Sequence, residues 1–201
     1  MRRALAVLAV AAVLHACAHL PVGTDGLSFE ERRARLEAHE SREIRGRLAV
    51  DTGERAFQGS FHWQRDADAM SLLVRGPLGG GVLQVSGTRT ELTVTARGET
   101  RLLTDPESEL SALVGWWLPV GSLHAWLLGL PDREFPAQTT LAPDGTLASL
   151  EQRLWRVDYV SYQLASGLLI PRRIDLKHGD LALRVTIDSS QPVGPAVSAL
   201  N

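Results

Sequence analysis

The sequence predicts a mainly β fold with a few helices: an incomplete antiparallel β-barrel of about 10–11 strands with a helical lid over an apolar cavity. Most of the chain after residue 43 alternates apolar and polar residues, in short runs bounded by glycine, proline and aspartate. Residues 105–131 instead have the period of a helix and are strongly apolar. Such helices must bury their apolar face, and the predicted sheet is the large surface available for that.

The 201 residues are enough for one well-buried domain and few for two. The chain is 44% hydrophobic and 22% charged, and its formal net charge is −2. Because basic residues are not in excess, the composition does not predict nucleic-acid binding or a strong electrostatic attraction to membranes.

Residues 1–16 have the features of a signal peptide. Arg2 and Arg3 precede the apolar stretch Ala4 to Leu14, which is too short to span a bilayer. The only cysteine, Cys17, follows at once, and Leu14-His15-Ala16-Cys17 resembles the bacterial lipobox, in which the cysteine becomes the acylated first residue. His15 departs from the small or β-branched residue usual there. The alternative is an ordinary secretory signal with an incidental cysteine.

Removal of this signal takes away two of the 21 basic residues, so 19 remain against 23 acidic ones and the net charge becomes −4. Ala18 stands where an aspartate would resemble an inner-membrane retention signal, which predicts export to the outer membrane. Residues 17–27 contain glycine and proline and few apolar residues, and we interpret them as a lipidated, flexible tether.

Residues 28–188 are expected to form a single domain. Ser28 to Arg42 is highly charged, with Phe29 and Leu36 on one face of a weakly amphipathic helix; a solvated arm is the alternative. Strand patterns begin at Ile44. They cover residues 44–50, 56–64, 70–74, 82–85, 91–96 and 101–103, with turns at 52–53, 66–68, 87 and 98.

Two apolar helices are predicted next. Asp105 can cap the first, Pro106 suits its first position, and Pro119 is expected to end it. Ser122 is expected to cap the second, and Gly129 with Pro131 to stop it. Leucine, valine and tryptophan residues spaced i, i+3, i+4, i+7 give each helix one apolar face: Leu110, Leu113, Val114 and Trp117 on the first, and Leu123, Trp126, Leu127 and Leu130 on the second.

Strand patterns then resume and continue to Ile187. They cover residues 139–141, 147–152, 155–159, 171–176 and 181–187, with turns at 143–145 and 178–180. Residues 189–201 are rich in proline, serine and glycine and are expected to form a flexible tail.

The sequence offers no arrangement of residues typical of an enzyme. It contains no Gly-x-Ser-x-Gly elbow, no phosphate-binding loop and no dinucleotide fingerprint, and the histidines after residue 19 form no pair with zinc spacing. We therefore predict no catalysis, no metal and no cofactor. His62 and His124 are expected on the surface or on a face of the barrel.

The loop Arg75 to Gly81 departs from the turn chemistry around it. Gly76-Pro77 and three glycines provide mobility, yet Leu78 places an apolar side chain at the tip. One interpretation is that Leu78 contacts a membrane or a hydrophobic partner. The other is that it folds back over the edge of the sheet.

Several short motifs follow one another in a fixed order: Gly46-Arg47-Leu48, Phe61-x-Trp63, Gly76-Pro77-Leu78-Gly79, Gly115-Trp116 with Leu118-Pro119, Trp126 to Pro131, Trp155-x-Val157-x-Tyr159 and Pro171-x-Arg173. Behind a lipobox, this order resembles the LolB family of outer-membrane lipoprotein receptors, over roughly Ile44 to Ile187. The chain departs from the family at Asp188-Ser189-Ser190, where an aromatic residue is common.

The resemblance implies an incomplete barrel with helices over an apolar cavity. It implies a protein at the periplasmic face of the outer membrane, lipid-anchored through Cys17, that takes lipoproteins from a periplasmic carrier and inserts them. The loop Pro77, Leu78 and Gly79 would serve insertion rather than receipt. We expect a monomer whose cavity binds the acyl chains of the cargo. The expected lining residues are Phe61, Trp63, Leu72, Val74, Leu92, Val94, Trp117, Trp126, Trp155 and Ile174.

Two other functions remain open from the sequence. A lipoprotein that binds or shuttles free lipid or glycolipid would share the cavity and the anchor, but it has less need of an exposed leucine in a loop. A structural lipoprotein with a filled barrel would not bind a dye that fluoresces in apolar cavities.

Overall fold

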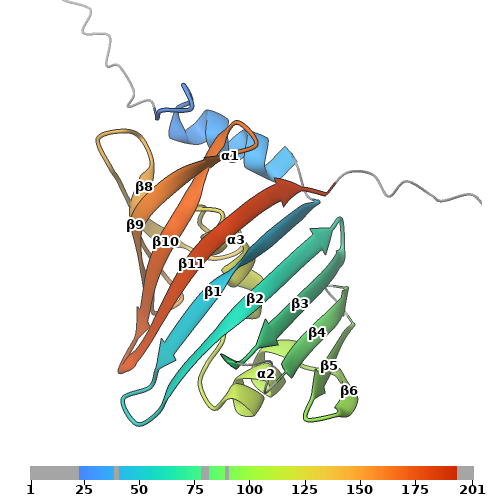
Figure 1. Cartoon of the computed structure of the whole chain (residues 1–201). Helices are drawn as coiled ribbons and strands as arrows, with labels where there is room; N and C mark the ends of the chain where they lie inside the picture. The colour runs from blue at the N-terminus through green and yellow to red at the C-terminus, as the bar shows by residue number, and fades with distance from the viewer. Residues whose placement is uncertain (1–22, 39–40, 78–81, 89–90, 194–201) are drawn as a thin grey trace, which may run out of the picture.

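A computed structural model describes residues 23–38, 41–77, 82–88 and 91–193. Within them, eleven antiparallel strands form one open sheet in the order β6-β5-β4-β3-β2-β1-β11-β10-β9-β8-β7 (Figure 1). The strands are β1 (Arg42–Asp51), β2 (Ala56–Asp66), β3 (Ala69–Arg75), β4 (Val82–Thr88), β5 (Leu92–Ala96), β6 (Glu99–Leu103), β7 (Ala137–Leu141), β8 (Leu147–Gln152), β9 (Trp155–Ala165), β10 (Leu168–His178) and β11 (Leu181–Pro192).

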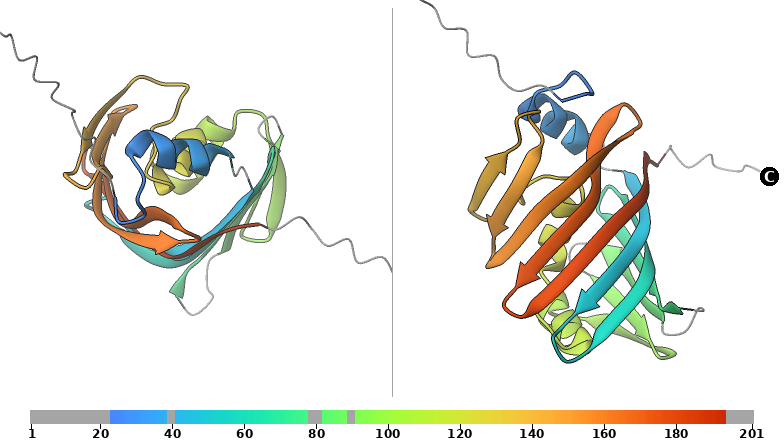
Figure 2. Two further views of the ribbon diagram at one scale, coloured as in Figure 1. Left: turned by 90° about the horizontal axis from the view of Figure 1, so that it is seen from above. Right: turned by 60° about the vertical axis from the view of Figure 1, so that its left-hand side comes forward.

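The sheet curls around its helices but does not close. Its two edges are β6 and β7, and the helices α2 (Pro106–Val114) and α3 (Val120–Leu127) connect them in sequence. Figure 2 shows α3 on the concave side of the sheet and α1 (Phe29–Ala38) across one end of it. The predicted fold class, an incomplete barrel with a helical lid, is confirmed.

The first and last strands pair at the centre of the sheet, and their register shifts between Arg45 and Gly46, because β11 has an extra residue there, Asp188. Glycine is needed beside this bulge. A Cβ on Gly46 would collide with the carbonyl oxygen of Thr186 and lie 2.7 Å from the ring of Phe61. The glycine therefore lets an aromatic ring from β2 cross directly over the backbone of β1.

The first lid helix begins as predicted. Asp105 is its N-cap and accepts a hydrogen bond from the backbone N–H of Ser108 (3.3 Å), and Pro106 occupies the first turn. Its predicted end was wrong. Gly115, in the left-handed conformation with φ 85°, ends the helix and returns its N–H to the carbonyl of Ser111, well before Pro119.

The predicted start of the second helix was also wrong. Pro119 is the N-cap of α3 and provides no side-chain hydrogen bond. Ser122 lies inside the helix, and its hydroxyl donates to Asp132 (2.6 Å). Gly129, at φ 74°, follows the helix as expected, and a Cβ there would press on Pro171 and the hydroxyl of Tyr162.

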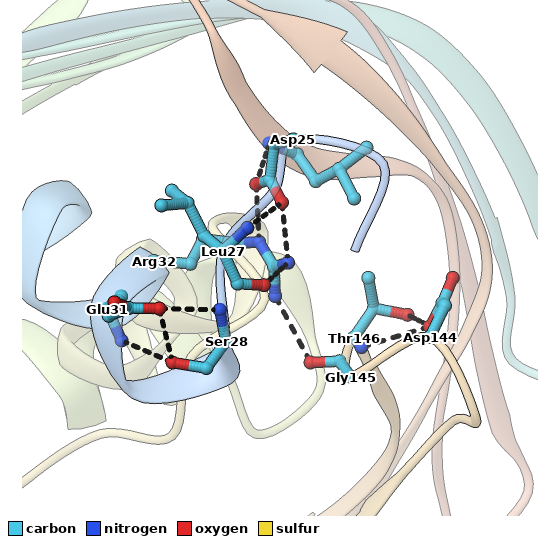
Figure 3. A network of polar contacts seen from close by, with 9 residues as sticks. Asp25, Leu27, Ser28, Glu31, Arg32, Asp144, Gly145 and Thr146 are labelled. Atoms are coloured by element: carbon cyan, nitrogen blue, oxygen red, sulfur yellow. Dashed lines mark hydrogen bonds and ion pairs between the residues drawn. The ribbon is translucent and has the colours of Figure 1, made fainter. Parts of the chain in front are cut away.

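Helix α1 is fixed to the sheet by a buried ion pair between Asp25 and Arg32, whose side chains are 0% and 4% exposed (Figure 3). The Arg32 guanidinium also donates to the carbonyl oxygen of Gly145, in the β7–β8 turn (3.1 Å). Asp25 accepts the backbone N–H of Leu169, in β10 (3.0 Å). The ion pair thus joins the segment before α1 to two distant hairpins, and we call this group of contacts the Asp25–Arg32 clamp.

Two predicted boundaries need correction. Residues 23–27 were expected to belong to a flexible tether, but Gly23 and Leu27 are buried and belong to the clamp region. The tail was expected from residue 189, but β11 continues to Pro192, because Arg42 to Arg45 extend its ladder. Cys17 lies outside the described residues.

Candidate functional site

A cavity of about 600 Å³ lies between α3, strands β2, β3 and β5, and the connection that follows α3. This volume is within the usual range for small-molecule sites, about 300–1,000 Å³. Apolar side chains from the sheet and the helices supply much of its lining: Leu36, Trp63, Met70, Leu92, Val120, Ala125, Leu128, Leu130, Pro131 and Phe135. Charged groups from β2, α1, α2 and several loops also line it: Glu37, Arg65, Asp68, Asp105, Glu107, Asp132, Arg133, Glu134 and Arg153.

Helix α3 presents one face to this cavity. Val120, His124 and Leu128 are four residues apart, which places them above one another on a helix, and all three line the cavity. On the other side, Trp63 of β2 lies with its ring centroid 5.8 Å from that of His124. The cavity is therefore a space between a helical face and a sheet rather than the interior of a closed barrel.

Ion pairs hold several of the charged lining groups in place. Arg153 donates from its two terminal guanidinium nitrogens to the two carboxylate oxygens of Glu107 in α2, with N–O distances of 2.5 and 3.0 Å. The same guanidinium lies 4.1 Å from the ring centroid of Phe135 and 5.1 Å from that of Trp117. Glu37 of α1 pairs with Arg133 in the connection after α3. These contacts fasten the lid to the first helix and to the β8–β9 turn.

The connection after α3 is fixed to the sheet by Gln152 of β8. Its side-chain oxygen accepts the indole N–H of Trp126 (2.8 Å) and the backbone N–H of Asp132 (2.9 Å). Its amide group donates to the carbonyl oxygens of Asp132 and Phe135. All these polar groups are satisfied, so the amide sets the position of the lid relative to the sheet.

His124 is neutral at physiological pH. Burial lowers its pKa to about 4 from 6.5, and the positive charges of Arg65 and Arg42 act in the same direction. The sequence placed His124 on the surface or a barrel face. It lies instead on α3 and lines the cavity.

Two of the ten predicted lining residues, Trp63 and Leu92, do line the cavity. Five others are buried in the surrounding core: Phe61, Val94, Trp126, Trp155 and Ile174. Three are partly buried and pack against that core: Leu72, Val74 and Trp117. Trp116 and Trp117 both approach Trp155, with centroids 6.5 Å apart in each case. Acyl-chain binding by these residues stays a prediction.

The lid residues that the sequence analysis missed are Val120, His124 and Leu128. Their four-residue spacing was available as a signal, but we assigned the apolar face of this helix to Leu123, Trp126, Leu127 and Leu130. Those four are buried in the core, and Leu130 also lines the cavity, so α3 is enclosed on two sides. Leu36 was expected on the apolar face of a weakly amphipathic helix, with no assigned part in the cavity, and it lines the cavity from α1.

The predicted insertion loop is described only in part. Pro77, which follows β3, is exposed. Leu78 and Gly79 lie outside the described residues. Among the helices that the structure describes, none is long and apolar enough to cross a membrane. No group of three or more histidine, cysteine or acidic residues suited to a metal ion occurs in the described part of the chain.

Comparison with known proteins identifies the family. The sequence profile described as "Outer membrane lipoprotein LolB" matches residues 40–189. The chain belongs to the LolB family. Similar proteins include the outer-membrane lipoprotein LolB of Nitrosococcus oceani, 33% identical over 82% of this chain and 83% of that protein. The LolB of Pseudomonas syringae pv. syringae is 31% identical over 84% of this chain and 82% of that protein.

Solved structures support the fold of this LolB-family chain. A LolA superfamily protein from Nitrosomonas europaea superposes with a TM-score of 0.55 at 6% sequence identity, over 84% of this chain and 95% of that one. The profile match confirms the family that the motif order indicated. The structural match shows that the fold is shared with a protein of almost unrelated sequence.

Proposed function

We propose that this chain is anchored in the outer membrane, facing the periplasm, by lipid on Cys17. There it accepts lipoproteins from a periplasmic carrier and inserts them into that membrane. The observation that supports this most is the cavity of about 600 Å³ between α3 and the sheet, in a chain of the LolB family. The relatives named outer-membrane lipoproteins support the location. The cavity would receive the acyl chains of the cargo.

Acyl chains explain why such a cavity is needed. Each methylene group exposed to water costs about 0.8 kcal/mol, so a whole chain costs on the order of 10 kcal/mol. Free passage through the periplasm is therefore negligible, and the chains must pass from one shielded site to another. A difference of about 1.4 kcal/mol in binding free energy between carrier and receptor already gives a tenfold bias toward the receptor.

The loop Pro77, Leu78 and Gly79 would carry out insertion. It connects β3 to β4, and a leucine within a glycine-rich connection can enter the acyl region of a bilayer at low conformational cost. Cargo receipt depends on the cavity and insertion on the loop, so a change at Leu78 should separate the two steps.

The test uses a soluble chain that begins at Ala18. It is incubated with a carrier loaded with a lipoprotein, and a pull-down locates the cargo. Delivery to liposomes is then compared between the wild type, Leu78→Glu and Leu154→Glu. Leu154 is a matched control because it is an 85% exposed leucine in a different connection between two strands, the β8–β9 turn.

We expect the cargo to move to all three proteins, and only Leu78→Glu to fail in delivery. Equal loss in both variants would contradict a specific role for the Leu78 loop. If no cargo moves and the wild type instead extracts free lipid, the receptor proposal is wrong and the protein is a carrier of free lipid.

A further inference from the structure

Among the buried polar atoms without a hydrogen-bond partner are Nε1 of Trp63, Nδ1 of His124 and Nε of Arg42. Two other indoles near the lid are satisfied, since Trp126 donates to Gln152 at 2.8 Å and Trp117 to Glu107 at 2.9 Å, whereas that of Trp155 is also without a partner. Buried polar groups nearly always have partners, so these unmet groups need an explanation, and two of them, on Trp63 and His124, belong to residues that line the cavity.

Trp63 and His124 face each other from β2 and α3. Their ring centroids are 5.8 Å apart, both residues line the cavity, and Trp63 is only 3% exposed. We call this contact the Trp63–His124 seam. Leu92, Val120 and Leu128 are among the apolar residues that line the same cavity.

Arg42 adds a positive charge beside this seam. It is 1% exposed and lies on β1, paired with Arg65 of β2, so it is close to Trp63 along the same face. Its guanidinium donates to the hydroxyl of Ser190 (3.0 Å) and forms no ion pair with a carboxylate within the described residues. A buried guanidinium without a counter-charge favours oxygen atoms that carry negative charge or partial negative charge.

The chemistry of these groups restricts the ligand. Indole and guanidinium groups only donate hydrogen bonds, so the ligand atom they bind must be an acceptor. A neutral imidazole can donate from Nδ1 in one tautomer. An acyl chain joined through an ester or amide supplies both parts: a carbonyl oxygen for the donors and a hydrocarbon tail for the apolar lining.

We propose that the Trp63–His124 seam binds the carbonyl oxygen of the ester or amide group that links an acyl chain to its head group. The cavity would then prefer ester- or amide-linked chains over ether-linked ones. This inference rests on the proposed function and adds a recognition element to it. Both seam atoms are shielded in this structure, so a ligand reaches them by displacing α3 from β2. Their unmet hydrogen bonds make the closed contact less stable and the displacement easier.

The test compares 1,2-dioctanoylglycerol with 1,2-dioctylglycerol, the ether that lacks the carbonyls. The protein is the chain from Ala18 to Asn201, which includes every described residue and therefore every contact above. Each lipid competes with a fluorescent dye for the cavity. We expect the ester to compete between about twofold and about tenfold better, which corresponds to one net hydrogen bond.

Trp63→Phe and His124→Phe remove the polar atoms and keep rings in the seam. In each variant, the ratio between competition by the ester and competition by the ether should fall toward one. Trp155→Phe is the matched control. Its indole N–H is also buried without a partner, but Trp155 does not line this cavity, so the preference should be unchanged. Dye affinity without lipid shows whether each variant retains the cavity.

Four results would overturn the inference. Equal competition by the ester and the ether in the wild type would show that the protein does not bind the carbonyl oxygen. Equal loss of preference in Trp155→Phe would show an indirect effect of packing. If neither lipid displaces the dye while lipoprotein transfer proceeds, the cargo chains bind elsewhere. If transfer also fails, the proposed function is wrong together with this inference.

Discussion

The Asp25–Arg32 clamp provides the sharpest test of how the N-terminal segment is held. Arg32→Leu would leave the Asp25 carboxylate buried at 0% exposure with its main partner removed. Leaving one member of a buried ion pair unpaired costs about 3–5 kcal/mol. Leucine is a good helix former, so the loss would not come from helix propensity within α1. We expect the free energy of unfolding to fall by about that amount.

Urea unfolding followed by tryptophan fluorescence measures this loss. Arg47→Leu is the matched control, because Arg47 pairs with Asp188 in a similar geometry (2.9 Å) but on the surface. Exposed pairs contribute about 0–1 kcal/mol, so the control should change little. If the two variants lose the same free energy, the clamp is not a buried ion pair in solution.

The clamp also predicts a pH dependence. Burial raises the pKa of Asp25, but hydrogen bonds from Arg32 and from the backbone N–H groups of Leu169 and Leu27 outweigh it and lower the pKa to about 2 from 3.8. A lowered pKa stabilises the fold above pH 3.8, and this contribution is lost as the pH falls through about 2. The difference in unfolding free energy between wild type and Asp25→Asn should therefore shrink by about 2 kcal/mol between pH 4 and pH 2. A constant difference would contradict the assignment.

Three further predictions concern the core and the lid. Gly46→Ala should lower the free energy of unfolding by about 1–3 kcal/mol in urea, because its Cβ meets the carbonyl oxygen of Thr186; a change below about 0.5 kcal/mol would contradict this. Gln152→Leu should lower it by at least about 2 kcal/mol, since Trp126 loses its acceptor; an unchanged thermal midpoint would refute the role of this amide. Because burial lowers the pKa of His124, stability should fall as pH falls from 6.5 to about 4, and His124→Phe should flatten that slope; an equal slope in both proteins would exclude His124.

The fold class was predictable because strand and helix periods are local. A strand with one face on the core must alternate apolar and polar residues along its sequence. The segment between β6 and β7 has the period of a helix instead, so its sequence alone distinguishes it from the strands. The order of the strands was not readable in this way. The pairing of β1 with β11 joins residues such as Gly46 and Ile187, and no local pattern encodes that partnership.

The errors at the helix ends have one cause. Trp117 continues the apolar spacing of α2, so the pattern extended past Gly115 to Pro119. The left-handed glycine ends the helix all the same, because its N–H closes the last turn. Trp117 then reaches the core from the connection after the helix, and its indole N–H donates back to Glu107. Apolar spacing records which side chains are buried, and burial does not require that the helix continue to them.

The cavity shows the same limit more clearly. Alternation places Phe61 and Trp63 on one face of β2, and the structure buries both. Their roles differ because their neighbours differ. The ring of Phe61 lies over the backbone at Gly46, a place made by a glycine on the adjacent strand. Trp63 meets His124 of the lid and lines the cavity. Strand parity predicts the face, but the residue opposite decides between core and cavity lining. If the cavity binds ligand as proposed, a substitution at Phe61 should act on stability and one at Trp63 on ligand preference.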